Sequence, residues 1–218
     1  MKRLLIFGDS ILRGVYFSEE AGRHKLFGDR FSELKARGWE VKNCSIMGAT
    51  VTTGEELLPK RLPEAQDDTT VLFEYGGNDC DYRWKDISDN PSGKFSPNTP
   101  ADRFVKEYGA CIDYAKRQGA RVFLCNLLPL DATRYVDWVS RNLSKENILK
   151  WLGSPEALIR TQEEYSLSAE QIAEDTESRI IDIRTPFRTP ALLSPDGIHP
   201  TAEGHRFLDS IITEAILS

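Results

Sequence analysis

The chain has 218 residues, enough for one domain with a sizeable buried core but short for two. Hydrophobic residues make up 40% and charged residues 28%, which is typical of a globular protein and excludes a disordered or fibrous one. The formal net charge of −6 argues against a nucleic-acid or anionic-membrane surface. We therefore expect a single domain over 1–218 that binds neither nucleic acid nor membrane.

The first residues and the cysteines indicate a cytoplasmic protein. The apolar run that follows Met1-Lys2-Arg3 ends after four residues, whereas an export signal needs roughly seven to fifteen. No stretch approaches the ~20 apolar residues of a membrane span. The four cysteines form no C-x-x-C pair, so we expect them to be buried, reduced thiols.

Five segments are predicted to be strands: 3–8, 40–46, 69–75, 120–126 and 178–183. The third and fourth contain near-continuous apolar runs, as expected for parallel strands covered on both faces. Helical patterns separate the strands. One helix should begin near Thr99-Pro100 and end at Gly119, and the last should span 201–217. This alternation predicts a parallel three-layer α/β/α sandwich.

Two connections are longer than a crossover between parallel strands requires. The first, at about 79–98, is rich in Asp, Asn, Ser and Pro, and the second, at about 129–176, holds two helical patterns. Long insertions at a sheet edge are often lids or binding loops. Four large residues of the second insertion are predicted to form either an apolar lid or a satellite core: Tyr135, Trp138, Trp151 and Leu152.

The sequence contains the three residue types of a catalytic triad. The serine lies near one end of the chain, and the acid and the base lie near the other. Ser10 follows the apolar run Leu4–Phe7 in a Gly-Asp-Ser turn, which would hold its hydroxyl at the carboxyl edge of the sheet. A serine nucleophile needs an adjacent base, and the base needs a carboxylate that fixes its tautomer. Asp196 and His199 lie three residues apart with Gly197 between them, so one local turn can bring them together.

Acyl transfer also needs hydrogen-bond donors that face the oxyanion of the transition state. Two further strand ends offer such donors. Gly48 follows the second predicted strand and can present its backbone amide closely, and Asn78 follows the third and offers a side-chain amide. Both residues should lie at strand carboxyl ends, as Ser10 does.

In this order, the motifs resemble the four blocks of the SGNH hydrolases, also called the GDSL esterase and lipase family. The resemblance implies a flavodoxin-like sheet and ester hydrolysis by Ser10, His199 and Asp196. It also implies an oxyanion hole made by the Ser10 amide, Gly48 and Asn78. One departure is that Ile11 stands directly after Ser10, where the family name records a leucine; this exchange concerns packing of the turn and not the chemistry. The blocks bracket nearly the whole chain: Gly8-Asp9-Ser10, Gly48, Gly76-Gly77-Asn78-Asp79 and Asp196-Gly197-Ile198-His199.

The residues that follow the Asn78 block indicate a substrate class. Asp81, Tyr82, Arg83 and Trp84 offer hydrogen-bonding groups and aromatic faces that can hold a hydroxylated ligand, or they pack the loop. We expect a serine esterase that acts on short acyl esters, acetyl first, of a polar alcohol such as a sugar. A medium-chain acyl thioesterase or lysophospholipase, with the lid residues lining an acyl channel, is the alternative. A non-catalytic ligand-binding module on the same fold is the alternative from another class.

Other motifs are missing from the sequence. His24 and His205 have no acid at a suggestive spacing and are expected to be surface or helix residues. There is no H-E-x-x-H motif, clustered Cys/His set, G-x-S-x-G elbow, P-loop or dinucleotide fingerprint. We therefore expect no metal and no cofactor, and a small-molecule ester as the partner.

Overall fold

The computed structural model describes residues 1–62, 68–187 and 189–218, and a five-stranded parallel sheet forms its centre. The strand order is β4-β1-β5-β6-β7. Each predicted strand segment contains one of these strands, so the predicted parallel α/β/α architecture is confirmed. When these five strands are renumbered 1 to 5 in the order in which they occur in the sequence, their order across the sheet is 2-1-3-4-5, which is the flavodoxin-like order. The strands are β1 (Arg3–Gly8), β4 (Glu40–Asn43), β5 (Thr69–Glu74), β6 (Arg121–Cys125) and β7 (Arg179–Ile181).

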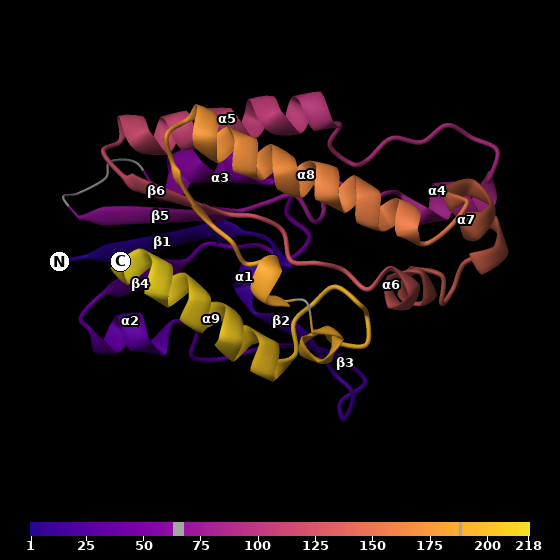
Figure 1. The fold of residues 1–218 in the computed structure, drawn as a ribbon, viewed down its shortest axis with the longest axis horizontal. Coiled ribbons are helices and arrows are strands. Elements are labelled where there is room, and N and C mark those ends of the chain that lie inside the picture. The colour runs from indigo at the N-terminus through magenta and orange to yellow at the C-terminus, as the bar shows by residue number, and fades with distance from the viewer. Residues whose placement is uncertain (63–67, 188) are drawn as a thin grey trace.

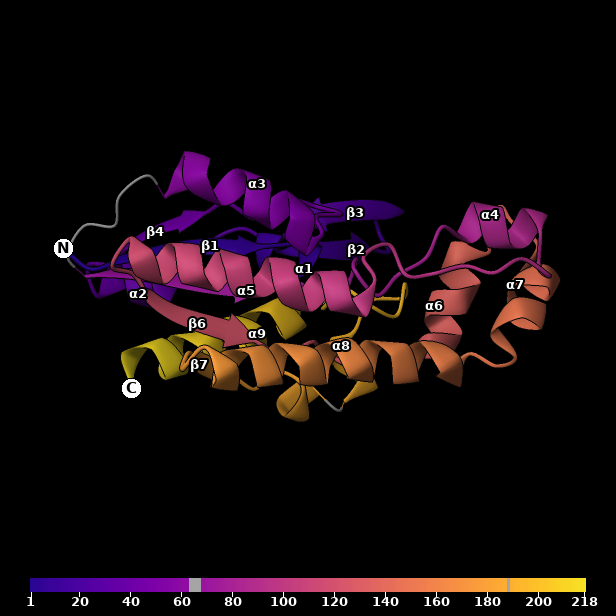
Figure 2. The same cartoon turned by 90° about the horizontal axis from the view of Figure 1, so that it is seen from above.

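Helices cover both faces of the sheet and complete three layers, as Figure 1 and Figure 2 show. On one face lie α3 (Val51–Arg61), α5 (Ala101–Arg117) and α8 (Glu156–Asp175). On the other lie α2 (Ser32–Ala36) and α9 (Ala202–Leu217). The helix predicted after Thr99-Pro100 corresponds to α5, and the one predicted over 201–217 corresponds to α9.

Alternate residues of the central strands fill two separate cores. Leu5 and Phe7 of β1 pack with the helices α3, α5 and α8, whereas Leu4 and Ile6 pack with α2 and α9. Successive side chains of a strand point to opposite faces, and here both faces are covered. This arrangement explains why β1, β5 and β6 each contain a continuous apolar run. It also makes the sheet a rigid base for the loops at its carboxyl edge.

A β-hairpin that the sequence analysis did not predict lies between β1 and α2. It pairs β2 (Val15–Ser18) with β3 (Arg23–Leu26) in antiparallel register. The sequence of β3 is Arg-His-Lys-Leu, and none of its side chains is buried. Such a polar segment lacks the alternation of a half-buried strand, so no periodicity marked it.

The hairpin is attached to the C-terminal part of the chain. The backbone amide of Phe17 donates to Ser194 Oγ at 3.3 Å, and Nε2 of His205 donates to the carbonyl oxygen of Val15 at 2.8 Å. His205 lies in α9 and is fully buried. Burial and then the positive charge of Arg30 lower the pKa of His205 to about 3, so its imidazole is neutral and structural.

The long insertions contain α4 (Trp84–Asp89), α6 (Ala132–Val139) and α7 (Lys145–Leu152), which gather at one end of the molecule (Figure 2). Of the four large residues singled out in the second insertion, Tyr135, Trp151 and Leu152 belong to a satellite core there. Trp138 instead contacts the hairpin. The buried residues of this satellite core are Trp84, Ile87, Tyr135, Val136, Ile148 and Leu158.

The cysteines are all free thiols. Cys80, Cys111 and Cys125 are buried and Cys44 is half-buried. Burial raises the pKa of each of these thiols, so they are protonated. Among the helices in the described part of the chain, none combines the length and the hydrophobicity needed to cross a membrane.

Candidate active site

Ser10 lies where the central strand β1 ends and the short helix α1 (Ser10–Arg13) begins. Asp9 caps this helix, and its Oδ1 accepts the backbone amide of Ile11 at 2.8 Å. A Cβ on Gly8 would lie 2.8 Å from a carbonyl oxygen of the neighbouring strand β5. A glycine is therefore required for the turn, and the turn fixes the Ser10 hydroxyl at the carboxyl edge of the sheet.

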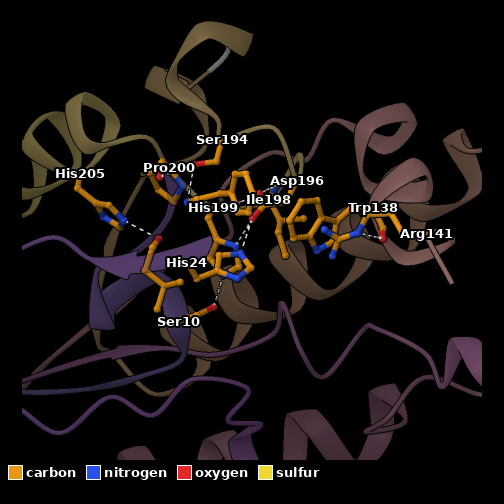
Figure 3. Close-up of polar contacts among 12 residues, drawn as sticks. Ser10, His24, Trp138, Arg141, Ser194, Asp196, Ile198, His199, Pro200 and His205 are labelled. Atoms are coloured by element: carbon orange, nitrogen blue, oxygen red, sulfur yellow. Dashed lines mark hydrogen bonds and ion pairs between the residues drawn. The ribbon is translucent and has the colours of Figure 1, made fainter. Parts of the chain in front are cut away.

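The three residues of the predicted triad form one hydrogen-bonded chain (Figure 3). Nδ1 of His199 lies 2.7 Å from Oδ2 of Asp196, and Nε2 lies 2.9 Å from Oγ of Ser10. An ionised carboxylate can only accept hydrogen bonds, so Nδ1 carries the proton. Nε2 is then the acceptor for the Ser10 hydroxyl, which is the arrangement that general-base activation of a serine requires.

A tight loop after the 3₁₀ turns η1 (Thr185–Phe187) and η2 (Pro190–Leu192) presents the acid and the base. Within it, the amide of Gly197 donates to the carbonyl oxygen of Ser194 at 2.9 Å. Gly197 has a φ of 80°, and a Cβ there would lie 2.6 Å from a carbonyl oxygen of the preceding insertion. Gly197 thus permits the left-handed backbone of the turn between Asp196 and His199, and it also permits close contact of this loop with the insertion.

The Asp196 carboxylate is fully buried and nevertheless ionised. Its Oδ1 accepts the backbone amides of Ile198 at 3.2 Å and His199 at 3.0 Å. Burial favours protonation, but the hydrogen bond from His199, the charge of that imidazole and the hydrogen bond from His24 outweigh it. Together they lower the pKa of Asp196 to about 2. The carboxylate is therefore available to a positively charged His199 at any pH above that value.

The three predicted oxyanion donors follow the adjacent strands β1, β4 and β5. Among the described residues, the backbone amides of Ser10 and Gly48 have no hydrogen-bond acceptor. Asn78 Nδ2 donates to Asp9 Oδ2 at 2.8 Å and to the carbonyl oxygen of Ala49 at 3.1 Å. These two acceptors fix which way the Asn78 amide points, and an oxyanion would compete with the longer bond.

Comparison with known proteins identifies the family. Residues 6–207 match the model of the GDSL-like lipase/acylhydrolase family. The chain belongs to this family. The protein is accordingly a hydrolase of the GDSL type. Comparison with curated protein sequences gives no match.

Solved structures show the same fold at low sequence identity. A lipase/acylhydrolase from Enterococcus faecalis is 21% identical with a TM-score of 0.70, covering 99% of this chain and 95% of that one. A single-residue variant of the acetyl xylan esterase Axe2 from Geobacillus stearothermophilus is 22% identical with a TM-score of 0.66, covering 98% and 93%. The acetyl xylan esterase AlAXEase is 21% identical with a TM-score of 0.63, covering 98% and 99%.

Beneath the predicted oxyanion hole of this GDSL hydrolase lies a buried pair of carboxyl groups, Asp9 and Glu74. Burial raises the pKa of Asp9, and burial together with the charge of Asp9 raises the pKa of Glu74 well above its usual range. The mutual influence of the two buried groups favours protonation of Glu74 over Asp9. Asp9 then remains able to accept from Asn78 and to cap α1.

A cavity of about 100 Å³ adjoins Ser10 and Asn78. Polar groups of Asp81 and Gln162 contribute to its lining as well. Two of the lining residues, Tyr135 and Leu158, also belong to the satellite core. The cavity therefore extends from the carboxyl edge of the sheet towards the insertions. Its apolar lining includes Ile11, Cys80, Leu127, Leu128, Leu130, Tyr135, Leu158 and Ile198.

The four predicted substrate residues occupy different surroundings. Asp81 lines the cavity, where burial raises the pKa of its carboxyl to about 6. Trp84 is buried in the satellite core and donates from Nε1 to Asp81 Oδ1 at 2.9 Å. The Tyr82 ring packs edge-on against Trp151 at 4.9 Å. Arg83 is exposed and precedes α4. Of these four residues, only Asp81 is among the described residues that line the cavity.

One residue of the site had no signal in the sequence. Nε2 of His24, in strand β3, lies 2.9 Å from Oδ2 of Asp196, the same oxygen that His199 contacts. The expectation that His24 is a surface or helix residue is therefore wrong, because it lies half-buried in a strand and contacts the acid of the predicted triad. Asp196 is 172 positions away, so no local spacing could have indicated the contact. In these three side chains, atoms of the kind that bind metals lie within 4.8 Å of one another. One nitrogen of His24 and one nitrogen of His199 face the same oxygen of Asp196, so the arrangement is a hydrogen-bond network.

Proposed function

We propose that the protein is a serine esterase that hydrolyses short acyl esters of a polar alcohol, acetyl esters first. The observation that carries the proposal is the hydrogen-bonded chain from Ser10 through His199 to Asp196, which ends beside a cavity of about 100 Å³. The hydrogen-bonded chain supports ester hydrolysis as the reaction, and the size of the cavity supports a short acyl group.

In the first half-reaction, Ser10 Oγ attacks the ester carbonyl carbon while Nε2 of His199 takes the hydroxyl proton. The negative charge on the carbonyl oxygen is stabilised by the amides of Ser10 and Gly48 and by the side chain of Asn78. Asp196 stabilises the imidazolium that forms. His199 then gives its proton to the alcohol, the bond to the alcohol oxygen breaks, and the acyl group remains on Ser10.

In the second half-reaction, water takes the place of the alcohol. His199 removes a proton from the water, which attacks the acyl carbon, and the same donors stabilise the second oxyanion. The bond to Ser10 breaks as His199 returns the proton to Oγ. The free acid leaves, and the enzyme returns to its starting state without any change in oxidation state.

The size of the cavity supports a short acyl group. Pockets for drug-sized ligands occupy roughly 300–1,000 Å³, whereas this cavity measures about 100 Å³. Of the four residues proposed for a long acyl channel, Tyr135 lines the cavity, whereas Trp151 and Leu152 pack in the satellite core and Trp138 packs against the hairpin. Acetyl xylan esterases and TesA are both among the similar solved structures, so the preference for an acetyl ester over the thioesterase or lysophospholipase alternative rests on the cavity.

Matched esters of increasing acyl length test the proposal, with Ser10→Ala as the control for background hydrolysis. We expect kcat/KM to be highest for acetyl or propionyl esters and to fall beyond butyryl. A steady rise from acetyl to octanoyl would contradict the proposal and favour the medium-chain alternative. Acetylated sugars compared with acetyl esters of apolar alcohols then test the alcohol.

A cavity variant sharpens this test. Leu158 lines the cavity and belongs to the satellite core, whereas Leu149 packs in the same core without being one of the described lining residues. Leu158→Ala should move the preferred acyl length upwards by enlarging the cavity, and Leu149→Ala should leave it unchanged. Equal shifts in both variants would show that the satellite core, and not the cavity wall, limits acyl length.

A further inference from the structure

Asp196 accepts hydrogen bonds from two imidazoles, and the reaction scheme uses one of them. We propose that His24 is a positioning residue, which holds the Asp196 carboxylate in the orientation that His199 requires. This inference rests on the proposed serine mechanism, since it assigns to His24 an effect that passes through Asp196 and His199.

The first argument is the number of donors around the buried carboxylate. Oδ1 of Asp196 accepts two backbone amides, and Oδ2 accepts Nδ1 of His199 and Nε2 of His24. Hydrogen bonds to an ionised group are about twice as strong as those between neutral groups. Without His24, Oδ2 would keep a single donor, Nδ1 of His199. His24 therefore supplies a second donor on the oxygen that faces His199, from a side chain that takes no part in the proton transfer.

The second argument is the way in which the His24 ring is held. It packs edge-on against Phe17 at 5.5 Å, Trp138 at 5.5 Å and His199 at 5.0 Å. Phe17 is also its partner across the hairpin. Figure 3 shows His24 and His199 close together beside Asp196. Since the side chain of His24 is only 27% exposed, it keeps one place and Nε2 keeps its distance from the carboxylate.

The third argument is the route of the chain. The hairpin directly follows α1, so the segment that carries the nucleophile also carries His24. The Phe17 amide donates to Ser194 Oγ, which in turn donates to the carbonyl oxygen of Pro200 at 3.1 Å. The hairpin is therefore attached to the loop of Asp196 and His199 by its backbone as well as by His24. Loss of His24 should alter the geometry of the base while leaving the acyl cavity intact, because His24 is not among the described residues that line it.

A pair of amide variants tests the hydrogen bond. In His24→Gln the side-chain amide nitrogen can take the position of Nε2, whereas in His24→Asn it is too short to reach Asp196. We expect His24→Asn to lower kcat on the order of tenfold to a hundredfold, with KM changing by less than about twofold, and His24→Gln to recover most of the loss. Equal losses in both variants, or a loss confined to KM, would overturn the proposal.

Phe17→Leu is the control for packing, because it removes one of the three rings around His24 while the other two still hold the imidazole at its hydrogen bond to Asp196. We expect its kcat to stay within about threefold of wild type. A loss as large as that of His24→Asn would show that ring packing, and not the hydrogen bond, positions the site. Thermal unfolding of every variant confirms that the variants compared are folded.

A double-mutant cycle with Asp196→Asn identifies the path of the effect. If His24 acts through Asp196, His24→Asn should cause little further loss in the Asp196→Asn background. Full additivity of the two losses would overturn the proposal. The rate of Ser10 labelling by a fluorophosphonate gives the same comparison without an ester substrate. Wild-type protein that is not labelled would refute the proposed serine mechanism, whereas labelled wild type with equally fast labelling of His24→Asn would refute the role of His24 alone.

Discussion

Asp79 gives a stability prediction whose size follows from its surroundings. Its carboxyl is fully buried next to the Asn78 block and accepts the backbone amide of Val51, at 3.0 Å to one oxygen and 3.2 Å to the other. It thereby connects the loop after β5 to the start of α3. Burial raises the pKa of Asp79 to about 6, although hydrogen bonds from Thr99 and Val51 act in the opposite direction.

The sign of the effect on stability follows from the direction of this pKa shift. The ordinary pKa of the group is 3.8, so between 3.8 and about 6 the folded protein binds a proton that the unfolded chain has lost. The associated stabilisation is complete below the unfolded pKa and is lost as the pH rises through the folded pKa. The shift corresponds to about 3 kcal/mol, of which about 2 kcal/mol is lost between pH 4.5 and pH 8.

Asp79→Asn removes this dependence, because the amide is neutral at every pH and its oxygen can still accept from Val51. Urea unfolding at pH 4.5 and pH 8 should show the variant gaining about 2 kcal/mol of unfolding free energy relative to wild type across that interval. The exposed Asp113→Asn is the matched control for the change in charge. A difference between Asp79→Asn and wild type that stays constant from pH 4.5 to pH 8 would refute the reasoning.

Three further predictions concern the reaction. Ser10→Ala and His199→Ala should each abolish turnover, and the double variant should lose little more, because triad members act as a unit; substantial activity in a clean Ser10→Ala preparation would exclude this nucleophile. Asn78→Ala should lower kcat on the order of a hundredfold with a smaller change in KM, whereas a loss confined to KM would make Asn78 a ground-state contact. The pKa of Asp196 is lowered to about 2, so protonation of this carboxylate should cause no loss of activity in acid until the pH nears that value. An NMR signal of the Asp196 carboxyl that titrates well above pH 2 would contradict this.

The central sheet could be predicted because burial on both faces requires a continuous apolar run in each of β1, β5 and β6. The predicted ends of the strands were less accurate, because hydrogen bonds from polar side chains stop the pairing between strands earlier than the apolar pattern indicates. The strand predicted over 40–46 ends at Asn43, whose side-chain oxygen accepts the amide of Ser45 at 2.9 Å and turns the chain. The strand predicted over 178–183 ends before Asp182, whose Oδ1 accepts the amides of Arg184 and Thr185.

Some residues of the candidate site could be predicted from the sequence and others could not. Ser10, Asn78 and His199 stand in short local motifs, and parallel strands bring such motifs to one edge of the sheet. His24 stands in a polar strand without periodicity, and its partner is distant in the sequence. Trp84 looked like a ligand contact because it follows the Asn78 block, yet its ring fills the satellite core. A tryptophan in a polar loop carries no local sign of which side of that loop it will occupy.

The proposed nucleophile and its proposed base are 189 positions apart, so the two ends of the fold must meet before Ser10 can be activated. During translation, a nascent chain that has emerged only as far as α8 would already contain the residues proposed to bind the oxyanion and most of those around the acyl cavity. It would have no base, and Ser10 would remain an ordinary alcohol. The onset of fluorophosphonate labelling in a translation reaction would therefore time the docking of the last loop. By the same logic, fragments separated between α8 and β7 would be inert apart, and labelling would report their reassociation.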